Sequence, residues 1–444
     1  MSDTLDQVRH CLEGVIPAVL ATCSADGTPN VTYVSQMQYV DAQHVALTFQ
    51  FFNKTRSNIL ANPQATALVI DPVTGDPYRL SLLYLRTETE GPLFQAVKAK
   101  LAGIASHTGM SGVFKLQGVD TYRVDAVERV PGGGLPRPPQ GRSRLHALRA
   151  SALRLVECHD LDALFDLTLS LLTQEFRISH ALLLMADLPG RRLYTVASRG
   201  YSSTGVGSEI AFGDGVIGVA AQYRVPIRIN HMTMEYGYGR VARDGAAAYA
   251  GPLETDIPFP GLAEPHSQLA VPIVAAGRLL GVLCLESPRD LAFDYDDEDA
   301  LVALAGLLGT TLLALQQTAE AAAAHEAPVP ATLPTGPAVE VRHYRANHSV
   351  FVGDDYLIKG VAGAILWKLL QTQAATGRCS FSNRELRAMP DIGLPELSDN
   401  LEARLVLLQR RLAERCPAIG LEKTGRGQFR LVLRGHPQLL DIDA

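Results

Sequence analysis

Two stretches rich in proline and glycine constrain this chain most, because they divide it into parts that must fold separately. Residues 131–144 read PGGGLPRPPQGRSR and contain almost no apolar side chain, and residues 325–337 repeat proline after an alanine-rich run. Such composition is typical of linkers, since proline and glycine interrupt both helices and strands. We therefore predict three domains, at residues 1–130, 145–320 and 338–444.

The bulk composition fits three packed domains and argues against some classes of function. The 444 residues are 47% hydrophobic and 19% charged, which is typical of globular proteins. A net charge of −6 argues against a chain that coats nucleic acid along its whole length, although it allows one basic module. No apolar run reaches the roughly 18 residues of a membrane span, and the first residues lack the order of a secretion signal. We therefore expect a cytoplasmic protein that does not contact a membrane.

The six cysteines lie far apart in the sequence. None belongs to a CxxC pair or to a Cys/His spacing that is typical of zinc sites. Isolated thiols at apolar positions are usually inert core residues, and Cys284, inside an apolar run, is expected to be one of them. We expect neither a disulfide framework nor a bound metal.

The first block contains a cluster of cationic and hydroxyl groups directly after a strand pattern. Apolar residues alternate from Val45 to Phe51, which is the period of a half-buried strand, and a short helix is expected to follow. Free backbone N–H groups at a helix start, reinforced by Lys54, Thr55 and Arg56, are suited to a phosphate group. A solvated turn between strand and helix is the alternative interpretation.

Many short strands and few helices favour a small antiparallel barrel for this block. Strands are expected at residues 17–23, 30–39, 44–52, 66–70, 78–87 and 120–129. The runs PAVLATCSADGTPNVTYV and FFNKTRSNILANPQATALVI, together with this order of elements, resemble the pyridoxamine-5'-phosphate-oxidase-like split barrels, an FMN-binding group. The resemblance covers about residues 14–128.

This resemblance implies an FMN site between the two barrels of a homodimer. Lys54 and Thr55 would hold the phosphate, assisted by Arg56 or Asn58. The residues expected at or near the flavin ring are Thr32, Thr48 and Gln50. The arginine-rich tail with which true oxidases bind a pyridoxal substrate is not visible, which weakens the expectation of oxidase chemistry more than that of flavin binding. Other members bind haem, another cofactor or none, and these alternatives stay open.

The middle block has the order of helices, antiparallel strands and a closing helix that is typical of a small-molecule sensor domain. The runs FGDGVIGVAAQYRVPIRI, SQLAVPIVAAGRLLGVLCLES and FDYDDEDALVALAGLLG resemble a GAF domain over about residues 150–317. The resemblance implies the fold but not the ligand, because GAF domains bind cyclic nucleotides, haem, bilins, 2-oxoacids or nothing.

A long segment between residues 229 and 267 of this block is rich in glycine and aromatic residues. Such a connection is usually a lid over a pocket or a disordered loop. The candidate ligand-binding residues in it are His231, Tyr236, Tyr238 and Arg240. A packing loop or a dimer contact is the alternative interpretation.

The third block reads as three helices followed by a β-hairpin, which is the order of a winged helix. The run LVLLQRRLAERCPAIGLEKTGRGQFRLVL resembles the C-terminal effector domain of two-component response regulators, over about residues 345–433. In that family the third helix enters the major groove of DNA and the hairpin tip contacts the minor groove or phosphates. By position, the implied DNA contacts are Arg404, Gln409, Arg410, Lys423 and Arg426.

Two residues depart from the response-regulator pattern. On the side of the third helix that should face DNA, this chain has Val406 and Leu407. Neither side chain can hydrogen-bond a base edge or neutralise a phosphate. The alternative is a winged helix used for dimerisation or for docking onto another domain.

Together these patterns predict a multidomain α+β protein with a split barrel, a GAF-type α/β sensor domain and a winged helix. The leading hypothesis is a cytoplasmic, homodimeric transcription regulator that responds to a small ligand or to flavin. The second hypothesis is an FMN-dependent oxidoreductase regulated by its GAF-like domain, although no acid–base pair in the barrel supports it. The third is a scaffold that only mediates protein contacts.

Overall fold

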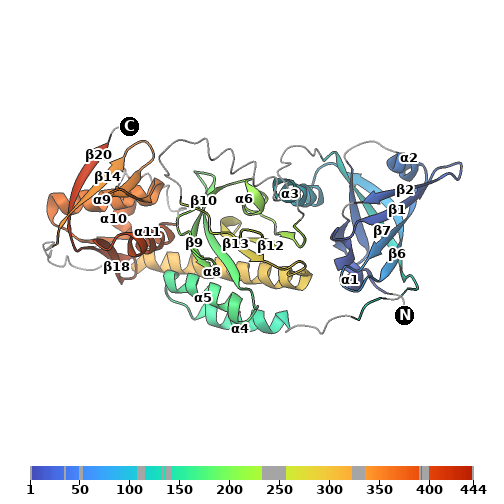
Figure 1. Cartoon of the computed structure of the whole chain (residues 1–444), viewed down its shortest axis with the longest axis horizontal. Helices are drawn as coiled ribbons and strands as arrows, with labels where there is room; N and C mark the ends of the chain where they lie inside the picture. Colours follow the sequence, from blue (N-terminus) through green and yellow to red (C-terminus); the bar gives the residue numbers. More distant parts are fainter. Residues whose placement is uncertain are drawn as a thin grey trace.

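The computed structural model of the chain describes residues 3–34, 37–49, 54–107, 116–132, 134–136, 143–232, 257–322, 336–389, 392 and 400–442. These residues form sheets of seven, six, four and three strands. We call the chain around the first sheet, the second sheet and the last two sheets the N-terminal, middle and C-terminal domains. The three lie in a row along the long axis of the molecule, in the order of the sequence (Figure 1).

The N-terminal sheet is antiparallel throughout, with the strand order β2-β1-β5-β6-β7-β4-β3. Its strands are β1 (Ala18–Cys23), β2 (Pro29–Val34), β3 (Gln38–Asp41), β4 (His44–Phe49), β5 (Gln64–Ile70), β6 (Pro77–Glu88) and β7 (Gly118–Arg129). Buried and half-buried residues alternate along β1, which confirms the period of two in that strand. Two short N-terminal helices, α1 (Leu5–Val8) and η1 (Arg9–Leu12), pack on the same core, and α2 (Lys54–Ala61) contacts β1 and β2.

The sequence predicted a single strand over residues 30–39, whereas the structure has two strands there. β2 pairs with β1, but β3 pairs with β4 at the opposite edge of the same sheet. Positions 31, 33, 37 and 39 are apolar in one phase, and the polar Ser35 and Gln36 interrupt this phase without ending it, so the sequence analysis missed the change of partner. Periodicity reports which face of a strand is buried, and not which strand lies beside it.

The middle sheet is also antiparallel, with the strand order β10-β9-β8-β13-β12-β11. Its elements are α4 (Arg144–Val156), α5 (Leu161–Gln174), β8 (His180–Asp187), β9 (Arg192–Arg199), β10 (Glu209–Ala211), α6 (Gly215–Tyr223), β11 (Ile227–Ile229), β12 (Ser267–Ala275), β13 (Arg278–Ser287) and α8 (Tyr295–Ala322). Leu183 and Leu285 share a hydrophobic core with α5 and α8 on one face of this sheet. Leu182 and Cys284 share a second core with α6 on the other face.

Among the described helices, α8 is the one whose length and apolar composition would allow a membrane span, over residues 295–318. In the structure it packs against β12 and α4, and Leu301, Leu304, Leu308 and Leu312 are fully buried in the protein core. Three acidic residues fill its first turn, where they complement the positive end of the helix dipole. These contacts explain its apolar composition by core packing.

Helix α3 (Pro92–His107) belongs to the N-terminal block in sequence but packs on the middle domain (Figure 1). It contacts α6 and β11, and Ala99 is buried in the core that α6 forms with the sheet. Gly103 permits this close approach, since a Cβ atom there would lie 2.6 Å from Ile227 Cγ2. The two domains are therefore joined by a packed helix.

The C-terminal domain contains a four-stranded sheet, β16-β15-β14-β20, and a three-stranded sheet, β17-β19-β18. Its elements are β14 (Ala338–Tyr344), β15 (Ser349–Val352), β16 (Asp355–Ile358), α9 (Gly360–Thr376), β17 (Ser380–Ser382), α10 (Asn383–Arg387), α11 (Leu401–Arg415), β18 (Ile419–Gly425), β19 (Gln428–Leu433) and β20 (His436–Ile442). Three helices thus precede the hairpin of β18 and β19, as the sequence predicted. The sequence analysis missed β20, which pairs in parallel with β14.

Candidate functional site

The first turn of α2 carries two of the predicted phosphate ligands. Lys54 is exposed at the first helical position, and Thr55 is half-buried beside it. The Thr55 hydroxyl oxygen accepts a hydrogen bond from Asn30 Nδ2 at 2.9 Å, which leaves the hydroxyl proton able to donate to a phosphate. Backbone N–H groups in the first turn of a helix have no partner within the helix, so Lys54 and Thr55 stand at a position that suits a phosphate group.

Arg56, by contrast, is held within the N-terminal domain by a carboxylate. Its Nη1 lies 2.6 Å from Oδ2 of Asp120 on β7, and its Nη2 donates to Thr87 Oγ1 on β6 at 3.2 Å. Asp120 is only 4% exposed, so removing the guanidinium would leave a buried carboxylate without its cation. The contacts of Arg56 therefore join α2 to the sheet.

The remaining predicted cofactor residues are spread over three elements. Asn58 is buried and donates to Thr22 Oγ1 at 3.2 Å. Thr32 on β2 and Thr48 on β4 are half-buried, and Gln50 lies outside the described residues. The structure thus groups Thr55 and Asn58 with Thr22 and Asn30, a cross-strand pair of β1 and β2 that the sequence analysis did not single out.

A second candidate site lies on the face of the middle sheet that α6 covers. Its polar row consists of His180, Glu286 and Gln268, which are cross-strand neighbours on β8, β13 and β12. The next row on the same face is apolar and consists of Leu182, Cys284 and Ala270. An apolar floor that ends in a few polar groups is suited to a small molecule with an apolar body and a polar head.

The Glu286 carboxylate is 3% exposed and accepts three hydrogen bonds. The donors are the Tyr201 hydroxyl at 3.0 Å, the Leu262 backbone N–H at 2.8 Å and Gln268 Nε2 at 2.9 Å. Burial raises the pKa of Glu286, and these donors offset part of that rise. Because Leu262 follows the long connection, Glu286 also fixes the point at which the chain returns to the sheet.

Tyr201 reaches Glu286 because the preceding backbone approaches β8 closely. Gly200 has a φ of +92°, and a Cβ atom there would lie 2.0 Å from the carbonyl oxygen of Ser179. The Tyr201 ring packs edge-on against His180, with ring centroids 5.5 Å apart. Burial raises the pKa of Tyr201, so its hydroxyl keeps its proton and donates a hydrogen bond to the carboxylate.

Of the residues predicted to bind the ligand of this domain, only His231 lies within the described residues. Its side chain is 47% exposed, and its Nδ1 lies 3.3 Å from Oδ1 of Asp290. The others, Tyr236, Tyr238 and Arg240, lie outside the described residues. The sequence analysis missed Glu286, although a carboxylate in phase with Cys284 within an apolar strand was a usable signal.

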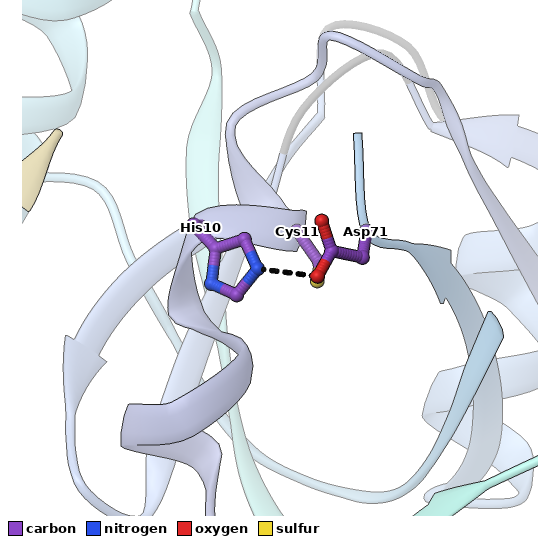
Figure 2. Close-up of side chains that lie close together, drawn as sticks. All are labelled: His10, Cys11 and Asp71. Carbon is purple, nitrogen blue, oxygen red and sulfur yellow. Dashed lines mark ion pairs between the residues drawn. The ribbon is translucent and has the colours of Figure 1, made fainter. Parts of the chain in front are cut away.

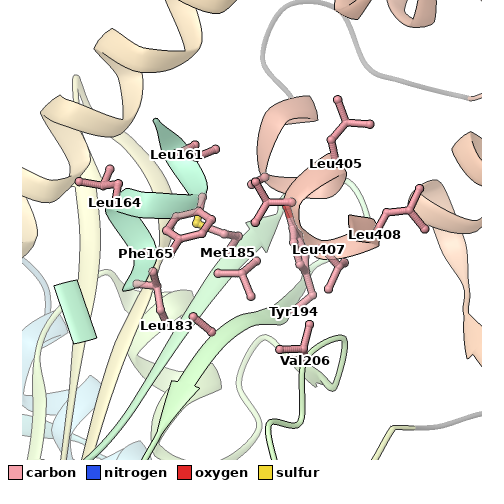
Figure 3. Close-up of a cluster of buried hydrophobic side chains, with 14 of the residues drawn as sticks. Leu161, Leu164, Phe165, Leu183, Met185, Tyr194, Val206, Leu405, Leu407 and Leu408 are labelled. Carbon is pink, nitrogen blue, oxygen red and sulfur yellow. The ribbon is translucent and has the colours of Figure 1, made fainter. Parts of the chain in front are cut away.

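The third candidate surface is helix α11, which is buried against the middle domain (Figure 3). Val406 and Leu407 are 6% and 4% exposed, and they share one hydrophobic core with Phe165 of α5 and Tyr194 of β9. Figure 3 shows Leu407 of α11 beside Tyr194 of β9, whereas Leu405 and Leu408 point away from α5 and β9. The sequence left open whether this side of α11 faces DNA or docks on another domain. In the structure it packs on the middle domain.

The basic residues of α11 and of the hairpin contact acidic residues of the middle domain. Arg404 is 4% exposed, and its Nη2 lies 3.2 Å from Asp187 Oδ1. Arg410 lies 2.6 Å from Asp162 and 2.8 Å from Asp166, and Lys423 lies 2.5 Å from Asp160. The two other predicted DNA contacts, Gln409 and Arg426, line small cavities in the same contact region. In this arrangement the carboxylates occupy positions at which these cations would meet phosphates.

A buried ion cluster joins the N-terminal and middle domains. Arg228 on β11 pairs with Glu13, and its Nε lies 2.7 Å from Glu298 at the start of α8. The Tyr295 ring lies 4.2 Å from the guanidinium carbon, and Asn230 Nδ2 donates to Glu13 at 2.7 Å. Burial alone would lower the pKa of Arg228, but the two carboxylates hold it above its usual value. The cation is thus compensated from both domains.

Comparison with protein families identifies two of the three domains. A family model described as pyridoxamine 5'-phosphate oxidase matches residues 4–103, and the model of the GAF domain matches residues 160–312. The chain carries a GAF domain behind a domain like pyridoxamine 5'-phosphate oxidase. It is a mixed α/β multidomain protein, and these two domain types indicate a ligand- or flavin-binding sensor.

Solved structures similar to parts of the chain include a GAF domain, a reductase and an FMN-binding protein. The GAF domain of a phosphoenolpyruvate-protein phosphotransferase from Coxiella burnetii is 20% identical, with a TM-score of 0.32, and the match covers 40% of this chain and 97% of that one. Free methionine-R-sulfoxide reductase from Neisseria meningitidis is 20% identical, with a TM-score of 0.32, over 41% and 96%. An FMN-binding protein from Syntrophomonas wolfei is 16% identical, with a TM-score of 0.25, over 29% and 90%. A comparison with curated protein sequences found no match.

Proposed function

We propose that this chain is a cytoplasmic transcription regulator in which the GAF domain and the N-terminal domain control DNA binding by the C-terminal domain. The order of elements in the C-terminal domain, three helices followed by a hairpin, supports a winged helix. The basic residues of α11 and of the hairpin tip are the candidate phosphate contacts. The signal is a small molecule on the α6 face of the GAF sheet or a flavin in the N-terminal domain.

The observation that carries this proposal is the docking of α11 on the GAF domain. α11 contributes Leu407 and Leu408 to the core that also contains Phe165 and Tyr194. A helix within a shared core cannot enter a DNA groove, so DNA binding through α11 requires the C-terminal domain to leave the GAF domain. A GAF ligand that favours the undocked state would therefore favour DNA binding in proportion to its preference for that state.

The test is a DNA-binding assay on the full chain and on a variant with weakened docking. Asp162→Ala with Asp166→Ala removes both carboxylates that pair with Arg410 and leaves the C-terminal domain unchanged, so it weakens docking. Fluorescence anisotropy should show that the variant binds a duplex from the upstream region of its own gene more tightly than the wild type does. The variant should also bind this duplex more tightly than a scrambled duplex of equal length. If neither protein prefers the upstream duplex at physiological salt, the proposed regulator function is wrong.

The family match over residues 4–103 and the fit at α2 support FMN in the N-terminal domain. Lys54, Thr55 and the first-turn N–H groups would hold the phosphate, whereas Arg56 is engaged by Asp120. FMN would supply redox chemistry or a redox signal. Purified protein should be yellow, and Lys54→Ala with Thr55→Ala should release the flavin. Arg79→Ala serves as the control, because Arg79 forms an exposed pair with Glu128. Colourless wild-type protein that takes up no added FMN would refute this part.

An FMN-dependent oxidoreductase regulated by the GAF domain is the second candidate function, and the same family match favours it. Oxidation of a reduced nicotinamide by flavin-loaded protein would support it. Activity that persists unchanged when DNA binding is abolished would separate it from the regulator.

Exposed apolar side chains support a homodimer as the working form. Val31 and Tyr33, on edge strand β2, are 65% and 81% exposed. On α4, Leu145 and Leu153 are 73% and 57% exposed. Apolar patches of this kind mark contact surfaces. If the wild type sediments as a dimer and a Tyr33→Lys variant as a monomer, the result would support a dimer contact at β2. A wild type that sediments as a monomer would exclude the homodimer.

A further inference from the structure

Three metal-binding side chains meet where the N-terminal helices pack on the barrel (Figure 2). His10 and Cys11 lie on η1, and Asp71 lies in the loop between β5 and β6. One ligand atom from each lies within 4.8 Å of the other two, and no other such group occurs among the residues that the structure describes. Cys11 is 4% exposed and Asp71 is fully buried. We call these three residues the His10 cluster.

The two oxygens of the Asp71 carboxylate have different surroundings. Oδ1 accepts the backbone N–H groups of Val73 at 2.8 Å and of Thr74 at 3.2 Å, which closes the turn of its own loop. Oδ2 lies 3.0 Å from His10 Nε2. Figure 2 shows the imidazole and the carboxylate facing one another, with the Cys11 sulfur beside them. The loop therefore fixes the carboxylate and presents Oδ2 to the imidazole and the thiol.

A carboxylate without access to water needs a positive partner to remain ionised. In the structure the imidazole of His10 and the two backbone N–H groups face this carboxylate. A divalent cation would supply a permanent positive charge between the carboxylate, the imidazole and the thiolate.

The ligand set indicates which class of ion fits. A thiolate, an imidazole and a carboxylate are the ligands of zinc-type ions, whereas magnesium and calcium take oxygen ligands. Tetrahedral bonds of the usual zinc lengths place ligand atoms about 3.4 Å apart. The present separation of 3.0 Å between Nε2 and Oδ2 is close to this value, so small rotations admit an ion. His10 is 26% exposed, which gives the ion a path from solvent.

We propose that His10, Cys11 and Asp71 bind a divalent cation of the zinc class, with a fourth position left for water. The sequence did not indicate this site because Asp71 lies far along the chain from the adjacent His10 and Cys11, and the three follow no known spacing. The ion would fix η1 on the barrel. The residues at both ends of η1 hold the GAF domain: Arg9 Nη2 lies 2.8 Å from Asp296, and Glu13 pairs with Arg228. The site would therefore stiffen the joint between the two domains.

The test uses the full chain, freed of metal with a chelator and titrated with Co²⁺. Cobalt bound to a thiolate gives a charge-transfer band in the near ultraviolet and tetrahedral bands in the visible, so the spectrum reports the ligand type. We expect one equivalent to bind with a thiolate band, and Zn²⁺ to displace it. Cys11→Ser should abolish the band, and His10→Gln should weaken binding by at least about tenfold.

Two further variants separate a lost ligand from a lost fold. Asp71→Asn keeps an oxygen acceptor for the turn and replaces Oδ2 by an amide, so it should weaken Co²⁺ binding while circular dichroism stays native. Cys23→Ser changes a thiol outside the cluster and should leave the titration unchanged. A Co²⁺ titration without a thiolate band, or a band that survives Cys11→Ser, would overturn the proposal. In that case the His10 cluster is an ion pair that joins η1 to the loop.

Discussion

Removal of the Arg410 side chain should loosen α11 from the GAF domain by a predictable amount. Its Nε donates to Asp162 Oδ1 at 2.6 Å and its Nη2 to Asp166 Oδ1 at 2.8 Å. It also donates to the carbonyl oxygens of Val196 and Asp162, each at 3.2 Å. The Arg410 side chain is only 19% exposed, whereas Asp162 and Asp166 are 37% and 65% exposed. Solvent therefore screens the two ion pairs more than it screens the hydrogen bonds to the carbonyl groups.

These contacts set the expected magnitude of the loss. The exposed Asp166 pair contributes about 0.5 kcal/mol at most, and the half-buried Asp162 pair about 1 kcal/mol. The two carbonyl oxygens lose hydrogen bonds of about 0.5–1 kcal/mol each. Arg410→Ala should therefore weaken docking by about 2–3 kcal/mol, which is a shift of about 30- to 150-fold in the docking equilibrium.

Hydrogen exchange of the α11 amides measures this shift directly. If the helix exchanges through undocking, its protected amides in Arg410→Ala should exchange about 30 to 150 times faster than in the wild type. Arg79→Ala, which removes an exposed pair with Glu128, should leave them unchanged. In a double-mutant cycle with Asp162→Ala, the two losses should not add. Wild-type exchange rates in Arg410→Ala, or strict additivity in the cycle, would refute the view that this arginine holds the helix in place.

Three further predictions concern other parts of the chain. Burial raises the pKa of Glu286, so the stability that its carboxyl group contributes at low pH is lost as the pH rises through the folded-state pKa. Glu286→Gln loses an acceptor for the donors at this site, but it should change the melting temperature more favourably at pH 8 than at pH 4.5. An equal change at both pH values would refute this prediction. Burial and the neighbouring His343 lower the pKa of His348, so this residue contributes stability above a pH of about 6.5 that is lost in acid. Hydrogen exchange of the β20 amides, where Asp441 binds His343, should therefore become faster below that pH. The same amides should show no such change in His348→Gln. Gly103→Ala should cost about 1–3 kcal/mol in calorimetry because its Cβ would meet Ile227, while Gly306→Ala in α8, which meets nothing within 4 Å, should be neutral or stabilising.

The sequence was informative where burial of a face determines the pattern. The strands of the N-terminal block, the helices of the middle block and the hairpin of the third were predicted because each buries one face against its own sheet. The apolar Val406 and Leu407 also pointed to a docking surface, which is what the structure contains. In each case the signal was local and periodic.

The sequence did not predict the contacts between elements that are distant in the chain. Helix α3 packs on two domains at once: Phe94 and Val97 share a core with β4 and β7 of its own sheet, and Ala99 is buried in the GAF core. Asp120 joins Arg56 across 64 residues, and Asp71 joins His10 across 61 residues, so neither pair has a spacing to recognise. Such pairs arise from tertiary packing, and a single sequence carries no record of it.

The GAF sheet is covered on both faces by parts of other domains, α3 on the α6 side and α11 on the α5 side. A change in the distance between this sheet and its covering helices therefore affects a contact with another domain on either face. A ligand that moves α6 away from the strands must strain the contact with α3, the contact with α11, or both. Substitutions that soften one joint should then redirect the response toward the other, so that barrel mutations far from α11 change how readily that helix is released.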